Sequence, residues 1–133
     1  MKIALLGYGR MGKEIEKIAL SRGHEIVIRK DVDDEIDITR ADVAIDFSVP
    51  HSAFNNIKNC IDNNVPVISG TTGWLEKYEE AVALCEEKNS AFIYASNYSL
   101  GVNIFFELNK QLAKMMSSLE DYNISMEEIH HTK

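Results

Sequence analysis

Residues 3–12 read IALLGYGRMG, and this stretch decides the fold. Ile3 to Leu6 form an apolar run without polar alternation, which predicts a parallel strand buried on both faces. Gly7, Gly9 and Gly12 follow in the GxGxxG spacing, directly before the pattern of an amphipathic helix. A strand, a glycine turn and a helix N-terminus in this order predict a site for the pyrophosphate of a dinucleotide.

Each glycine of the turn has its own physical reason. Gly7 permits a tight turn out of the strand, Gly9 lets a pyrophosphate approach the backbone, and Gly12 lets the helix pack closely on the sheet. We therefore expect the whole turn to bind the cofactor, through Gly7, Tyr8, Gly9, Arg10, Met11 and Gly12. The alternative is a tight strand-to-helix connection that uses the same glycines without a ligand.

Length and composition exclude several classes of protein. The 133 residues suffice for one domain with a real core, but they are few for a complete two-domain enzyme. Lys and Arg number 14 against 21 Asp and Glu, and the net charge of −7 argues against a nucleic-acid partner. No apolar run reaches the roughly 18 residues of a membrane span, and no signal-peptide pattern opens the chain, so we expect a cytoplasmic protein without membrane contact.

Cysteine and histidine spacing gives no sign of a metal site. The sequence has neither CxxC nor HExxH, so we expect no bound metal. Cys60 and Cys85 fall on apolar positions of expected helices. We interpret them as reduced core thiols, with a disulfide or a reactive pair as the alternative.

An acidic residue at the end of the second expected strand, residues 25–30, bears on the choice of cofactor. Asp31 lies 19 residues after Gly12, near the roughly 20 at which a dinucleotide fold places its ribose-binding carboxylate. Such a carboxylate accepts both ribose hydroxyls of NAD and repels the 2′-phosphate of NADP. Arg29 and Lys30 stand beside it and can hold that phosphate. The sequence leaves the choice between NAD(H) and NADP(H) open and favours use of both, and a solvated acidic surface run is the alternative for Asp31.

Two polar loops are expected at the same edge of the sheet as the glycine turn. Further strands are predicted by the apolar runs 43–47, 65–69 and 91–95, with helical patterns between them. Gly70 to Gly73 (GTTG) follows one of these strands, and Ser96 to Gly101 (SNYSLG) follows the next. Because the carboxyl ends of parallel strands meet at one edge, both loops are expected to complete the cleft, with threonine hydroxyls and N–H groups facing a ribose or the nicotinamide amide. Thr72 can also serve as a plain helix N-cap.

The last part of the chain changes character after a long helix expected over residues 102–116. Residues 122–126, YNISM, alternate apolar and polar side chains, which predicts a strand of a sheet with one solvated face. We therefore expect an α/β Rossmann-type doubly wound parallel sheet over residues 1–120 and the start of a truncated α+β domain over 121–133. In a regular strand His130 and His131 would point to opposite faces, so that one can act chemically while the other binds; a solvated tail is the alternative.

The chain resembles the N-terminal half of the 4-hydroxy-tetrahydrodipicolinate reductase (dihydrodipicolinate reductase) family. The resemblance covers essentially all 133 residues. It rests on five fragments in the right order: GYGRMG at 7–12, IDFSVP at 45–50, GTTGW at 70–74, ASNYSLGVN at 95–103 and EIHHTK at 128–133.

The resemblance implies roles for individual residues. The turn of residues 7–12 would hold the cofactor pyrophosphate and Asp31 the adenosine ribose. The nicotinamide half would lie against Gly70, Thr71, Thr72, Ala95, Ser96, Asn97 and Tyr98. His130 would transfer a proton, and His131 and Thr72 would bind substrate. The family often carries arginine after the acid; here Val32 follows it, which leaves Arg29 or Lys30 as substitutes.

The same resemblance implies an activity. The family reduces a small cyclic dicarboxylate with NAD(P)H, on the diaminopimelate route to lysine, as a homotetramer. Its motif continues beyond these residues with a catalytic lysine and an SGT segment that binds a substrate carboxylate. The chain stops one residue before that lysine, and Lys133 is not assigned its role, so the chain is expected to be catalytically incomplete. Two alternatives remain: a dinucleotide-binding module without a reaction, and another Rossmann oxidoreductase such as an amino-acid dehydrogenase.

Overall fold

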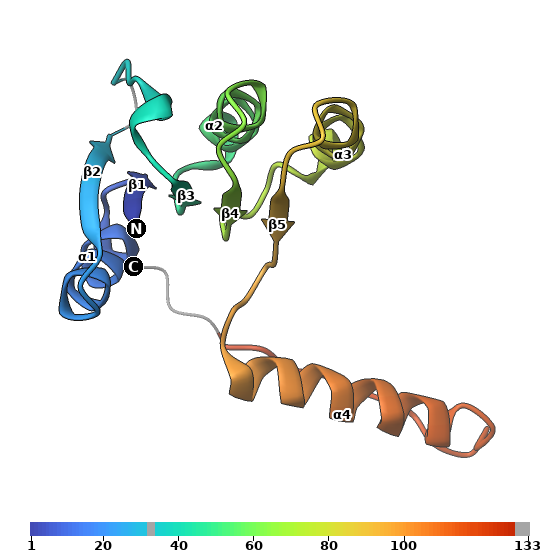
Figure 1. Cartoon of the computed structure of the whole chain (residues 1–133). Helices are drawn as coiled ribbons and strands as arrows, with labels where there is room; N and C mark the ends of the chain where they lie inside the picture. The colour runs from blue at the N-terminus through green and yellow to red at the C-terminus, as the bar shows by residue number, and fades with distance from the viewer. Residues whose placement is uncertain (32–33, 130–133) are drawn as a thin grey trace. The chain divides into compact units, whose positions relative to one another are not determined.

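The computed structural model describes residues 1–31 and 34–129 of the chain (Figure 1). In chain order the elements are β1 (Lys2–Leu6), α1 (Arg10–Ser21), β2 (Glu25–Lys30), η1 (Ile38–Arg40), β3 (Val43–Asp46), α2 (Pro50–Asp62), β4 (Val67–Ser69), η2 (Leu75–Lys77), α3 (Tyr78–Glu87), β5 (Phe92–Tyr94) and α4 (Leu100–Met116). None of the helices in the two described ranges combines the length and the apolar character that a membrane span requires.

The chain divides into two compact units, Met1–Ser96 and Asn97–Lys133. The first unit contains the five strands with α1, α2 and α3, and the second contains α4. The domain boundary expected at residue 120 stays a prediction.

The first unit is built around a five-stranded parallel sheet in the order β2-β1-β3-β4-β5. The chain leaves the interior strand β1 toward β2 on one side and then crosses to β3 on the other side. Because the direction of winding reverses there, α1 covers one face of the sheet while α2 and α3 cover the other (Figure 1). The predicted doubly wound α/β fold is confirmed.

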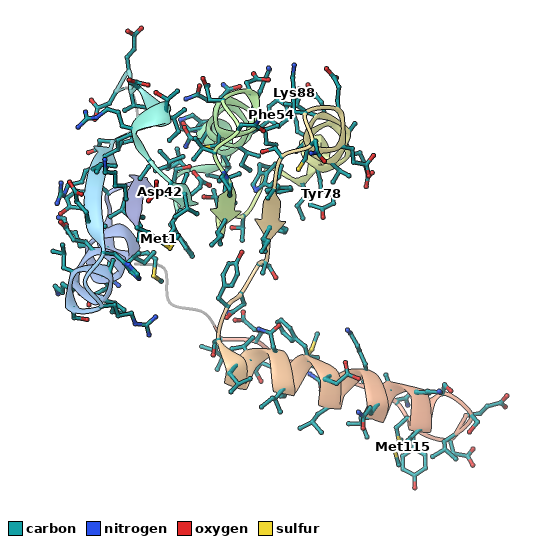
Figure 2. All side chains as sticks on the ribbon, viewed as in Figure 1. Met1, Asp42, Phe54, Tyr78, Lys88 and Met115 are labelled. Atoms are coloured by element: carbon teal, nitrogen blue, oxygen red, sulfur yellow. The ribbon has the colours of Figure 1, made fainter. Side chains whose placement is uncertain are left out.

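The core of the first unit lies on both faces of β1. Ala4 and Leu6 pack with the residues of α2 and α3, whereas Ile3 and Leu5 pack toward α1. All four side chains are at most 5% exposed, which confirms the prediction of a strand buried on both faces. On the face of α2 and α3, Phe54 and Tyr78 join this core (Figure 2).

The strand predicted over residues 122–126 is not formed. In the second unit α4 ends at Met116, and residues 117–129 contain turns and irregular backbone. A strand is stable only when a neighbouring strand satisfies its N–H and C=O groups, and the described residues of this unit contain no such neighbour. All side chains of residues 122–126 are exposed, including the apolar ones, with Ile124 at 74% and Met126 at 87%.

Candidate cofactor site

A cleft opens at the carboxyl edge of the sheet in the first unit, between β1 and β3, where the order of the strands reverses. Its cavity has a volume of about 170 Å³. The lining residues come from the glycine turn, the end of β2, the loop after β3, and α2: Gly7, Tyr8, Gly9, Lys30, Asp31, Phe47, Ser48, Val49, Ser52 and Asn56. The glycine turn and the ribose-binding acid predicted from the sequence thus face one cavity.

A second hollow of about 220 Å³ continues the cleft. It shares Phe47 and Ser48 with the first cavity, and its other lining residues are Met11, Pro50, Gly70, Thr71 and Thr72. The loop of residues 70–72 therefore lies beside the glycine turn, as the sequence predicted. The ring of Phe47 packs so closely on Gly70 that an added Cβ would lie 2.2 Å from it.

The three glycines of the turn have different environments. Gly7 has φ +94°, and a Cβ there would lie 2.2 Å from the carbonyl oxygen of Phe47. A Cβ on Gly12 would lie 2.4 Å from the carbonyl oxygen of Gly7. In contrast, Gly9 has φ −78° and an added Cβ would have no neighbour within 4 Å. The fold itself thus requires Gly7 and Gly12, while the space beside Gly9 is open.

A buried carboxylate lies beneath the cleft. Asp46 ends β3 with 0% exposure, and one of its oxygens accepts hydrogen bonds from Ser48 Oγ at 2.7 Å and Asn56 Nδ2 at 2.9 Å. The other oxygen accepts from Ser69 Oγ at 2.9 Å and Thr71 Oγ1 at 2.7 Å. The Thr71 hydroxyl also accepts from the Ser48 N–H at 2.8 Å. One carboxylate therefore joins the two loops that line the cleft.

The hydroxyl of Thr71 does not have the role that the sequence suggested. Thr71 is 5% exposed, and its hydroxyl is bonded to Asp46 and Ser48 instead of facing a ligand. Thr72 is exposed, and the following helix begins after Trp74, so Thr72 is not its N-cap. Trp74 is buried, and its Nε1 donates to the Thr71 carbonyl oxygen at 2.8 Å, which fixes the loop from below.

The two cations at the end of β2 have different partners. Arg29 Nε donates to Glu16 of α1 at 2.9 Å, and Tyr8 donates its hydroxyl hydrogen to the same carboxylate. These hydrogen bonds, that of Arg29 first, lower the pKa of Glu16, and the bond to Glu16 raises the pKa of Tyr8. In contrast, Lys30 Nζ donates to Asn56 Oδ1 at 2.8 Å and lines the cleft.

Comparison with known families identifies the family of the chain. Residues 21–98 match the family described as "Dihydrodipicolinate reductase, N-terminus". The chain belongs to the dihydrodipicolinate reductase family. The match covers most of the first unit and extends into the loop after β5.

Curated relatives carry the name of the same reductase. The chain is 58% identical to the 4-hydroxy-tetrahydrodipicolinate reductase of Christiangramia forsetii over 98% of this chain and 56% of that protein. It is 38% identical to the 4-hydroxy-tetrahydrodipicolinate reductase of Methanoregula boonei over 82% of this chain and 42% of that protein. The chain thus spans about half the length of these members of the dihydrodipicolinate reductase family.

Solved structures of low sequence identity share the fold. A putative homoserine dehydrogenase from Archaeoglobus fulgidus superimposes with a TM-score of 0.58 at 15% identity, over 71% of this chain and 42% of that chain. The homoserine dehydrogenase of S. aureus gives a TM-score of 0.52 at 19% identity, over 71% of this chain and 32% of that chain. Both likenesses concern the α/β fold alone.

Not all residues that the family resemblance points to are gathered in the cleft. Ala95 and Ser96 follow β5, where the Ala95 N–H donates to the Ser69 carbonyl oxygen at 3.2 Å, and they line neither hollow. Asn97 and Tyr98 belong to the second unit. His130 and His131 lie outside the described residues.

Sequence reasoning missed Asp46 and Asn56 as parts of the site. The signal for Asp46 was present, because a lone carboxylate in the apolar run VAIDF is an unusual residue for a buried strand. Asn56 gave no such signal, since an asparagine at a helix position normally faces solvent.

Proposed function

We propose that the cleft of the first unit binds a nicotinamide dinucleotide, NAD(H) or NADP(H), with its pyrophosphate on the glycine turn. The observation that carries the proposal is the environment of Gly9. Its φ of −78° suits any residue, and nothing lies within 4 Å of the Cβ that alanine would add. Folding therefore does not require glycine at this position, whereas a pyrophosphate lying against the backbone does.

The remaining roles follow from the chemistry of the lining groups and, for residues 95–98, from the family resemblance alone. N–H groups in the first turn of α1 have no acceptor within the helix and donate to the pyrophosphate. Asp31 accepts the ribose hydroxyls, and the loop of residues 70–72 with residues 95–98 holds the nicotinamide half. The proposed cofactor residues are Gly7, Tyr8, Gly9, Arg10, Met11, Gly12, Asp31, Gly70, Thr71, Thr72, Ala95, Ser96, Asn97 and Tyr98. Thr71 contributes through its backbone, since its hydroxyl is bonded to Asp46.

We further propose that the chain is the N-terminal part of a 4-hydroxy-tetrahydrodipicolinate reductase. The 58% identity to the Christiangramia forsetii relative supports this assignment. The bound cofactor supplies a hydride to a small cyclic dicarboxylate; His130 transfers the proton, and His131 and Thr72 bind the substrate. A homotetramer for the full-length protein and a cytoplasmic location belong to the same proposal, and the free thiols of Cys60 and Cys85 fit a reducing compartment.

The test of the cofactor site is the substitution Gly9→Ala. The methyl group fills the space of the pyrophosphate, so the dissociation constants of NADH and NADPH are expected to rise at least about tenfold, while the thermal midpoint stays within about 3 °C. Fluorescence of the reduced nicotinamide measures the binding. Gly7→Ala is the contrasting variant, because its Cβ clashes with Phe47 and lowers the midpoint itself. Undiminished binding by Gly9→Ala, or no binding by the unaltered chain, contradicts the proposal.

A further inference from the structure

The side chains of Arg29 and Lys30 leave β2 on opposite faces of the sheet. The Arg29 guanidinium lies on the α1 side, where it donates to Glu16 and lies 6.0 Å from the centre of the Tyr8 ring. It therefore braces the glycine turn from outside the cleft. Lys30 lies on the α2 side, and its ammonium group donates to Asn56 within the cleft.

The position of the Lys30 ammonium is held by a chain of hydrogen bonds. Asn56 is 3% exposed and presents its side-chain oxygen to Lys30 at 2.8 Å. The amide nitrogen of Asn56 donates to Asp46 at 2.9 Å and to Ser48 Oγ at 3.1 Å, so the amide cannot turn over without losing these bonds. An ammonium group has three donors, and the bond to Asn56 uses one of them.

Lys30 and Asp31 place opposite charges at adjacent positions on the wall of the same cavity. At the end of β2, a carboxylate binds the ribose hydroxyls, and a neighbouring cation can accommodate a 2′-phosphate on that ribose. Without a cation, the carboxylate of Asp31 would repel a phosphate carried by the ribose that it binds. The two side chains together suit a ribose with or without the phosphate.

We propose that Lys30 is the residue that lets this cleft accept NADP(H) as well as NAD(H), by binding the 2′-phosphate, and that Asp46 and Asn56 hold it in position. The inference rests on the proposed dinucleotide site and assigns its specificity. Arg29 has no part in it, because its guanidinium is bonded to Glu16 on the other side of the sheet.

The test measures the dissociation constants of NADPH and NADH for the full chain and its Lys30→Gln variant. Glutamine keeps a donor for Asn56 and removes the charge. The constant for NADPH is expected to rise about tenfold, since hydrogen bonds to charged groups are the strong ones, while that for NADH stays within about twofold. Lys30→Arg retains the charge and is expected to keep NADPH binding within about threefold. Arg29→Gln is the matched control, for which the ratio of the two constants is expected not to change.

The possible results separate the two proposals. A parent chain that binds neither dinucleotide overturns the proposed function and this inference with it. Binding of both cofactors with an unchanged NADPH-to-NADH ratio in Lys30→Gln overturns the inference alone, because an ammonium group that braces the fold or binds the shared pyrophosphate affects both cofactors equally. A ratio that changes in Arg29→Gln instead assigns the phosphate to Arg29 and also overturns it. Thermal midpoints of all variants show whether each has folded. If Lys30→Gln has not folded, Lys30→Arg decides the question, and a loss of NADPH binding in that variant with NADH binding unchanged overturns the inference.

Discussion

The carboxylate of Asp46 accepts four side-chain hydrogen bonds, and these are expected to make a large contribution to the stability of the fold. Replacing Asp46 with alanine leaves the donors of Ser48, Asn56, Ser69 and Thr71 without their shared acceptor beneath the cleft. We expect Asp46→Ala to lower the free energy of unfolding by about 3 kcal/mol, because buried polar groups that lose a charged partner are costly. Urea denaturation followed by Trp74 fluorescence measures the change.

The matched control for this prediction is Asp62→Ala. Asp62 forms an exposed ion pair with Lys58 within α2, and such pairs contribute at most about 0.5 kcal/mol. Equal destabilisation by the two alanine variants would show that the network beneath the cleft contributes no more than a surface ion pair.

Single residues also mark how far the sequence could predict the site. Gly7, Gly9 and Asp31 were predictable, because a strand, a turn, a helix and a second strand that are contiguous in sequence place them. The network at Asp46 was not, because Ser69 and Thr71 lie 23 and 25 residues away along the chain and meet it only when β3 and β4 pair. For the same reason the sequence could not distinguish Arg29 from Lys30, whose partners lie on α1 and α2.

At the scale of elements, α2 is held on the sheet by an apolar face that includes Cys60. Burial, and then the negative charge of Asp46, raise the pKa of the Cys60 thiol from 9.0 to about 12. In the unfolded chain the thiol ionises near its ordinary value, so the unfolded state loses a proton that the folded state retains. The stability contributed by neutral Cys60 is therefore complete below about pH 9 and is lost as the pH rises toward 12.

This linkage predicts a pH-dependent difference between the parent chain and Cys60→Ala, which lacks the thiol. We expect the difference in free energy of unfolding to shrink by about 1–2 kcal/mol between about pH 8 and pH 10.5. Denaturant titrations at several pH values measure it, and the comparison cancels the titration of lysines and tyrosines common to both chains. A constant difference over this range would mean that the thiol ionises equally easily in both states.

Elements differ in how well their sequence pattern determines them. The five strands of the sheet are short, but their apolar side chains have only the two faces of one sheet to occupy. The pattern at 122–126 is equally regular, yet it forms no strand. Alternation indicates only that one side of a strand would be solvated; it does not supply the neighbouring strand on which the hydrogen bonds depend.

At the scale of the whole molecule, binding and turnover are expected to depend on different lengths of chain. The cleft lies within residues 7–72, whereas the chain spans 56% of the Christiangramia forsetii reductase. The resemblance places a catalytic lysine and a carboxylate-binding segment beyond residue 133. We therefore expect the 133-residue chain to bind NADPH but to oxidise it with the cyclic dicarboxylate at least about 1,000-fold more slowly than a chain extended by the remaining residues of that relative, because acid catalysis and charge stabilisation each contribute about 100-fold or more.

Stopped assays of NADPH oxidation with both chains measure this difference, and the extended chain with His130→Ala provides the matched control for the proton-transfer step. Pyridine-2,6-dicarboxylate, an unreactive dicarboxylate of similar shape, should tighten NADPH binding in the extended chain and leave the 133-residue chain unchanged. Equal turnover by the two chains would place every group needed for catalysis within residues 1–133. The extended chain could also bind NADPH tightly, yet neither turn over this substrate nor respond to the dicarboxylate. That result would support the dinucleotide site and contradict the reductase assignment. The cleft alone does not determine which electrophile receives the hydride.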